Sequence, residues 1–182
     1  MNKFFVEIGA ANFDTLLPLA QMGWSGIVVE PVPRFYEECK RMFANYDVTV
    51  VQAAVSDYNG DIDFAVARDD GSWLSGCSHV VSDNHLGYNL STSPDRIGDF
   101  DVRIVVPCVT LDTLLQHVDS VDLMKVDVEG HENNIFNSYS FRVKPSVVKI
   151  EHKHIDDKLL VKNLESNGYL VWTEKDDIYG VV

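Results

Sequence analysis

The sequence predicts an α/β domain built around a mostly parallel β-sheet. Short β-branched runs alternate with stretches of helical periodicity through most of the 182 residues, which is the pattern of consecutive βαβ units. A chain of this length corresponds to about one domain and buries roughly 70% of its unfolded surface on folding. Apolar residues make up 46% of the chain and charged residues 24%, as is usual for soluble globular proteins. We therefore expect residues 1–182 to form a single domain with its own core.

The N-terminal part is expected to alternate strands and helices. Residues 4–8, 26–30 and 48–55 are apolar or β-branched runs that predict the first three strands. The first helix has the apolar stripe Leu16, Leu17, Leu19 and Ala20 and ends at Gly23. A second helix is indicated by apolar side chains that recur at helical spacing between residues 35 and 43. Residues 58–61 (YNGD) predict a tight turn into an extended segment at residues 62–66.

The periodicity disappears between residues 68 and 101, where Gly, Ser, Asp, Asn and His dominate. A structureless stretch of that length in a compact domain is usually a lid, a binding loop or a mobile segment. We therefore expect a loop-rich insertion at about residues 68–101, for which all three roles stay open.

Regular structure is expected again from residue 102 onward. Strands are predicted at residues 102–109, 121–127, 146–152, 169–173 and 178–182. A short helix at residues 111–117 is expected to have Thr110 as its N-cap, and a helix begins near Gly130. The last helix spans residues 155–167 and is closed by Gly168.

Charge and cysteine content exclude several classes of function. Acidic residues outnumber basic ones 28 to 15, giving a formal charge of −13, which disfavours a partner held through phosphates. The cysteines, Cys39, Cys77 and Cys108, form no CxxC pair, so we expect a reduced, cytoplasmic setting. No apolar run approaches the length of a membrane span, and Glu7 interrupts the only stretch that resembles a signal peptide.

Residues that could bind a ligand follow the first two strands. Ligands of open α/β sheets bind beyond the carboxyl ends of the strands. The first strand runs into Gly9, Ala10, Ala11 and Asn12, where Gly9 permits close approach of a ligand to the backbone. The second strand ends at Glu30 and Pro31, and an acidic side chain about 20 residues after such a glycine suits a ribose hydroxyl pair. These positions predict a nucleoside site.

The turn after the first strand favours a cofactor without phosphates. A dinucleotide needs its pyrophosphate cradled by G-x-G-x-x-G, but Ala11 and Asp14 stand where the second and third glycines belong. S-adenosylmethionine carries a sulfonium and an ammonium group instead, and both cations suit an acidic pocket. A nicotinamide-dependent dehydrogenase is the alternative enzyme class.

Five segments resemble those of a known family: residues 6–10 (VEIGA), 29–33 (VEPVP), 54–57 (AVSD), 109–115 (VTLDTLL) and 122–132 (DLMKVDVEGHE). In these segments the chain resembles the FkbM-type family of class I methyltransferases. It implies a Rossmann-like fold, with a mostly parallel seven-stranded sheet, helices on both faces and an antiparallel last strand. It also implies S-adenosylmethionine-dependent methyl transfer, usually to a hydroxyl oxygen.

The same resemblance implies roles for individual residues. Glu7, Gly9 and Ala10 would line the methionine part of the cofactor, with Ala11 and Asn12 following in the same turn. Glu30, next to Pro31, would bind the ribose. Ala54 and Val55 would lie at the adenine, and Asp127 near the transferable methyl group. The chain departs from the family pattern at Ala11 and Phe13, which replace small or glycine positions.

Methyl transfer to oxygen needs a base within hydrogen-bond reach of the acceptor. Asp127, Glu129 and His152 are the expected catalytic residues, and Glu151 and His154 lie beside them in sequence. His152 is the natural base near neutral pH. Carboxylates with a histidine also suit a divalent metal, which we do not favour. The structural alternatives are helix capping by Asp127 and Glu129, a surface pair of His152 and His154, and a place for His131 on the surface of the following helix.

Two other functions are weighed against O-methylation of a small molecule or sugar. Lys125, Asp127, Lys149 and Glu151 invite comparison with the Lys-Asp-Lys-Glu tetrad of RNA 2′-O-methyltransferases. However, they form two adjacent pairs rather than coming from separate elements, and the net charge opposes an RNA groove. The other alternative is a degenerate domain that binds the nucleoside without catalysis. The oligomeric state cannot be derived from the sequence.

Overall fold

The computed structural model describes residues 3–11, 15–67, 77–81 and 102–182. Within these ranges the strands are β1 (Phe4–Ile8), β2 (Ser25–Val29), β3 (Val48–Val51), β4 (Ala54–Val55), β5 (Gly60–Val66), β6 (His79–Val80), β7 (Val102–Val109), β8 (Leu123–Val126), β9 (Val147–Glu151), β10 (Leu170–Glu174) and β11 (Asp177–Val181). The helices are α1 (Leu17–Gln21), α2 (Pro33–Phe43), α3 (Leu111–Leu114), α4 (Glu132–Ser138) and α5 (Asp157–Ser166).

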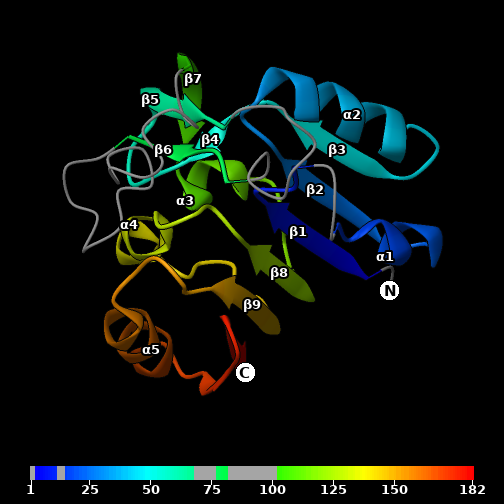
Figure 1. Cartoon of the computed structure of the whole chain (residues 1–182). Coiled ribbons are helices and arrows are strands. Elements are labelled where there is room, and N and C mark those ends of the chain that lie inside the picture. The colour runs from blue at the N-terminus through cyan, green and yellow to red at the C-terminus, as the bar shows by residue number, and fades with distance from the viewer. Residues whose placement is uncertain (1–2, 12–14, 68–76, 82–101) are drawn as a thin grey trace.

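A seven-stranded sheet forms the centre of the fold (Figure 1). Its strand order is β10-β11-β9-β8-β1-β2-β3, and every pair is parallel except those that β11 makes with β9 and β10. The predicted seven-stranded sheet with an antiparallel last strand is therefore confirmed. The chain leaves β1 toward β2 on one side and returns to β8 on the other, so the strand order reverses at β1. Ligands bind at such a switch point in open α/β sheets.

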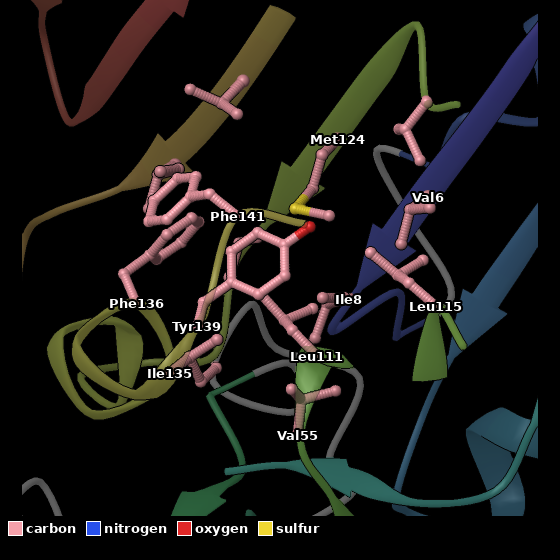
Figure 2. Packing of buried hydrophobic residues seen from close by; sticks show 14 of the residues in the cluster. Val6, Ile8, Val55, Leu111, Leu115, Met124, Ile135, Phe136, Tyr139 and Phe141 are labelled. Carbon is pink, nitrogen blue, oxygen red and sulfur yellow. The ribbon is translucent and has the colours of Figure 1, made fainter. Parts of the chain in front are cut away.

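Helices cover both faces of this sheet, because alternate side chains of each strand point to opposite faces. Phe5 and Val28 pack with α1 and α2 through Ala20, Cys39 and Phe43. Val6 and Ile8 point to the other face and join the largest core cluster, which Figure 2 shows with residues of α3 and α4 such as Leu111 and Phe136. The expected helical layers on both faces are confirmed.

A second sheet, with the strand order β4-β7-β5-β6, was not anticipated. The predicted strand at residues 48–55 is wrong as a single element, because its two ends pair with different strands. The Val51 carbonyl accepts a hydrogen bond from the Glu30 amide, whereas β4 pairs with β7 and the Ser56 amide donates to the Val109 carbonyl. The chain therefore passes from one sheet to the other between β3 and β4.

Several local predictions can be compared directly. The Thr110 N-cap is confirmed, since its side chain accepts a hydrogen bond from the Thr113 amide, although α3 is shorter than expected. Within the predicted insertion, the structure describes residues 77–81, which include β6. This strand pairs with β5, and the rest of the insertion lies outside the described residues. None of the helices described above combines the length and the apolar composition that a membrane span requires.

Candidate functional site

The turn after β1 lies between the ends of β2 and β8. The Gly9 amide donates to the Val29 carbonyl at 3.0 Å, and the Asp127 amide donates to the Ile8 carbonyl at 3.0 Å. Gly9 has a φ of +78°, and a Cβ at this position would lie 1.7 Å from the Asp127 carbonyl oxygen. Only glycine fits here, because it tolerates this conformation and has no side chain to clash.

Glu30 at the end of β2 is bound to this same turn. One carboxylate oxygen accepts the Ala11 amide and the other accepts the Val32 amide, each at 2.8 Å. The Cys39 thiol donates to the Ala11 carbonyl at 3.2 Å, so Ala11, with a φ of +44°, is held from both sides. Burial raises the pKa of Glu30 to about 7, against the opposing effect of the two amide hydrogen bonds. The expected juxtaposition of the Gly9 turn and Glu30 is present.

Glu7 supports the turn from within the sheet. It is fully buried, pairs with Lys125 of the neighbouring strand at 3.5 Å, and accepts the Leu16 amide at 2.9 Å. The carboxylates of Glu7 and Glu30 therefore hold the two described ends of the segment between β1 and α1. Asn12, which the sequence also places here, lies outside the described residues.

The predicted adenine positions lie on β4, and both are buried. Ala54 belongs to the cluster that includes Val32 and Phe35 and that contacts Ala11, so it lies near the Glu30 region. Val55 contributes its side chain to the main core instead (Figure 2). Pro31, next to Glu30, is buried as well.

The loop between β8 and α4 carries Asp127 and Glu129 and is shaped by Glu132. Glu129 and Gly130 have φ values of +55° and +106°. The Glu132 carboxylate, 1% exposed, accepts the amides of Val128 at 3.0 Å and Gly130 at 3.1 Å. Burial raises the pKa of Glu132 to about 8. Sequence reasoning missed this residue, whose signal is a glutamate in the first turn of a helix, two residues after a glycine.

The alternative in which Asp127 and Glu129 cap the following helix is wrong. The N-cap of α4 is His131, without a side-chain capping bond, and the loop amides bind Glu132 instead. His131 is also buried, with 3% exposed, so its predicted place on the helix surface is wrong.

Carboxylates from β8 and β9 gather beside this loop. Burial, followed by the nearby Glu129 carboxylate, raises the pKa of Asp127 to about 6. The same two causes, in the same order, raise the pKa of Glu151 to about 9. Glu151 Oε2 is buried and has no hydrogen-bond partner among the described residues. This group of acids can hold protons near neutral pH.

The two histidines after β9 have different neighbours. His154 Nε2 lies 3.2 Å from Glu129 Oε2, with both side chains mostly buried. His152 Nε2 lies 3.2 Å from the Lys175 carbonyl, in the turn between β10 and β11. The structure therefore brings His154, rather than His152, into contact with the predicted acidic group.

The same acidic group offers one donor set of the kind that metals bind. Ligand atoms of Glu129, Glu151 and His154 lie within 4.8 Å of one another, and two carboxylates with an imidazole suit a divalent ion by type. Glu129 and His154 contact each other directly, so two of these three groups have a partner without a metal.

The lysines of the tetrad comparison form other ion pairs. Lys125 pairs with Glu7, and Lys149 pairs with Asp177 at 3.4 Å. Each lysine thus faces a carboxylate outside the proposed tetrad.

Comparison with known proteins gives one family match. A model of the methyltransferase FkbM domain matches residues 7–171, whereas no curated protein matches the chain. Among solved structures, the ribosomal protein L11 methylase from Lactobacillus delbrueckii subsp. bulgaricus is 11% identical, with a TM-score of 0.48 over 99% of this chain and 69% of that chain.

Two further solved structures are similar at the same low level. The C-terminal domain of precorrin-6Y C5,15-methyltransferase from Rhodobacter capsulatus is 8% identical, with a TM-score of 0.48 over 99% of this chain and 79% of that chain. The glycopeptide N-methyltransferase MtfA, solved with S-adenosyl-L-methionine, is 10% identical, with a TM-score of 0.42 over 99% of this chain and 80% of that chain. At these scores the family assignment rests on the domain match.

Proposed function

This chain belongs to the family of FkbM methyltransferase domains, and on that premise we propose that it transfers a methyl group from S-adenosylmethionine to a hydroxyl oxygen of a small molecule or sugar. The observation that carries the proposal is the buried Glu30 carboxylate bound to the turn after β1. This contact joins the glycine turn after β1 to the acidic residue at the end of β2, and a nucleoside site in this fold requires both features. Residues 1–182 are proposed to form a single methyltransferase domain.

The described residues fit the proposed cofactor. A carboxylate has about four lone-pair positions, and the Ala11 and Val32 amides take one on each Glu30 oxygen. The remaining positions suit a pair of ribose hydroxyls. The close packing of Gly9 on the Asp127 backbone places the β1 turn directly beside the loop proposed to face the methyl group. The proposed cofactor-binding residues are Glu7, Gly9, Ala10, Ala11, Asn12, Glu30, Pro31, Ala54, Val55 and Asp127.

When bound, the cofactor supplies a methyl group on a cationic sulfur. The acceptor hydroxyl must lose its proton as its oxygen gains that methyl group, so a base has to stand beside it. Asp127, Glu129 and His152 are the proposed catalytic residues. We add His154, because its imidazole contacts the Glu129 carboxylate, whereas His152 contacts the Lys175 carbonyl.

The experiment that tests this function is calorimetry followed by a turnover assay. S-adenosylmethionine and S-adenosylhomocysteine are titrated into the chain, and release of S-adenosylhomocysteine is then followed with panels of hydroxylated small molecules and sugars. Binding of both nucleosides with turnover on a hydroxyl supports the proposal. Binding without turnover on any acceptor supports a degenerate domain, and absence of binding overturns the proposal.

A further inference from the structure

A buried hydrogen bond joins the residue after β4 to the N-cap residue of α4, and these two segments carry different parts of the proposed site. Ser56 Oγ lies 3.0 Å from His131 Nε2, and the two residues are 0% and 3% exposed. Ser56 directly follows β4, and Ala54 of β4 belongs to the apolar cluster against which Ala11 packs. His131 ends the loop that begins at Asp127. The contact therefore links the proposed nucleoside side to the proposed acceptor side.

The direction of this hydrogen bond is fixed by Asp57. The Ser56 hydroxyl donates to Asp57 Oδ1 at 3.0 Å. A serine hydroxyl has one hydrogen to donate, so the Ser56 oxygen accepts from His131. The imidazole consequently holds its hydrogen on Nε2, and a donor chain runs from His131 through Ser56 to Asp57.

Ser56 itself is firmly held, which makes it an anchor. Its amide donates to the Val109 carbonyl at 3.0 Å, continuing the pairing of β4 with β7. The loop from Asp127 to His131 has its own fixed start, where the Asp127 amide meets the Ile8 carbonyl. Glu132 sets the internal shape of the loop, and the bond to Ser56 sets where its far end lies.

A buried polar pair of this kind adds little net stability but favours one geometry over others. Methyl transfer depends on that geometry, because a displacement of about 1 Å costs on the order of a hundredfold in rate. We propose that Ser56 and His131 are positioning residues of the methyl-transfer site, which hold Asp127 and Glu129 at a set place relative to the nucleoside end of the cofactor. This inference rests on the proposed function.

The test is a double-mutant cycle, which measures whether Ser56 and Asp127 contribute independently to cofactor affinity. The affinity for S-adenosylmethionine is measured by calorimetry at pH 8 for wild type, Ser56→Ala, Asp127→Asn and the double variant. If Ser56 acts by placing Asp127, the fold loss of affinity that Asp127→Asn causes should be at least about three times smaller in the Ser56→Ala background than in wild type. Additive effects, or an Asp127→Asn variant that binds like wild type, overturn the inference.

A rescue pair separates hydrogen bonding from general stability. The side-chain amide of Gln places a donor near the position of Nε2, so His131→Gln should keep binding within about twofold of wild type. His131→Leu should lose about three- to tenfold, as expected for one removed hydrogen bond. If Ser56→Ala does not fold, this pair decides the question alone. Equal loss in both His131 variants contradicts the inference.

The matched control is Ser78→Ala. Ser78 is a buried serine whose hydroxyl accepts one hydrogen bond, from the Ala67 amide at 3.0 Å, in the part of the second sheet formed by β5 and β6. It should lower thermal stability about as much as Ser56→Ala while leaving the cycle with Asp127 additive. A wild-type chain that does not bind S-adenosylmethionine overturns the proposed function itself, whereas binding with an additive Ser56 cycle overturns only this inference.

Discussion

Single side chains at the carboxyl edge of the sheet determine the proposed site. Glu30 and Glu7 are buried acids whose oxygens accept backbone amides, so each stabilises the segment between β1 and α1 that is proposed to bind the cofactor. Burying a carboxylate is unfavourable unless it is hydrogen-bonded. Retaining two of them around one turn is consistent with a binding role beyond folding.

Gly9→Ala should abolish cofactor binding and destabilise the chain. The new Cβ would lie 1.7 Å from the Asp127 carbonyl oxygen, at a φ of +78°. Gly23→Ala is the matched control, because Gly23 has a φ of +86° and nothing within 4 Å of its Cβ position. Thermal unfolding should show a loss of about 1 kcal/mol for Gly23→Ala and clearly more for Gly9→Ala. Equal losses would show that the contact with Asp127 is not tight.

Glu30 should make cofactor affinity depend on pH. Burial raises its pKa to about 7, and protonation removes an acceptor and the negative charge from the proposed ribose site. Affinity for S-adenosylmethionine is therefore expected to fall as the pH drops from 8 to 6. Glu30→Gln should bind about 1 to 3 kcal/mol more weakly at pH 8 and lose most of this pH dependence. Calorimetry at three pH values measures both, and an unchanged affinity in Glu30→Gln would exclude the ribose role.

At the scale of elements, the strands and helices around the sheet were mostly predictable, and the second sheet was not. Helical periodicity finds α2 because this helix buries one face, and β1 is found as a short apolar run because both of its faces are buried. It cannot show that a mostly apolar run changes its pairing partner, as happens between Val51 and Ala54. In the same way, the strand ends indicated Glu30 and Asp127, but the contacts of Glu132 and His131 depend on how α4 begins.

The α3 cap gives an element-scale prediction. Thr110 accepts the Thr113 amide through its side chain, so Thr110→Ala should lower the free energy of unfolding by about 1 kcal/mol. Thr110→Ser keeps the acceptor and should lose much less. Urea unfolding of the three proteins measures the difference. A serine variant as unstable as the alanine variant would mean that the methyl group, rather than the cap, stabilises this end of α3.

For the whole molecule, burial of acids makes stability depend on pH in a definite direction. The pKa values of Asp127, Glu30, Glu132 and Glu151 are raised from 3.8 or 4.5 to about 6, 7, 8 and 9 respectively. The folded chain thus keeps protons that the unfolded chain has lost above about pH 4.5. The stability that these groups contribute is complete below that pH and is lost as the pH rises through their folded pKa values.

The melting temperature should therefore be higher at pH 6 than at pH 9.5. Glu151→Gln removes the acid with the highest of these pKa values and should melt above wild type at pH 9.5, with a smaller difference at pH 6. Glu165→Gln, on the exposed side of α5, removes a negative charge at pH 9.5, as Glu151→Gln does at that pH, and serves as the control there. Calorimetric scans at both pH values measure the effect. A wild-type chain that is more stable at pH 9.5 would contradict the raised pKa values.

The most direct test of the account is a crystal structure of the chain with S-adenosylhomocysteine. We expect the ribose hydroxyls within hydrogen-bond distance of the Glu30 carboxylate, and the sulfur facing the loop that carries Asp127. A nucleoside bound away from Glu30, or at the opposite edge of the sheet, would contradict it.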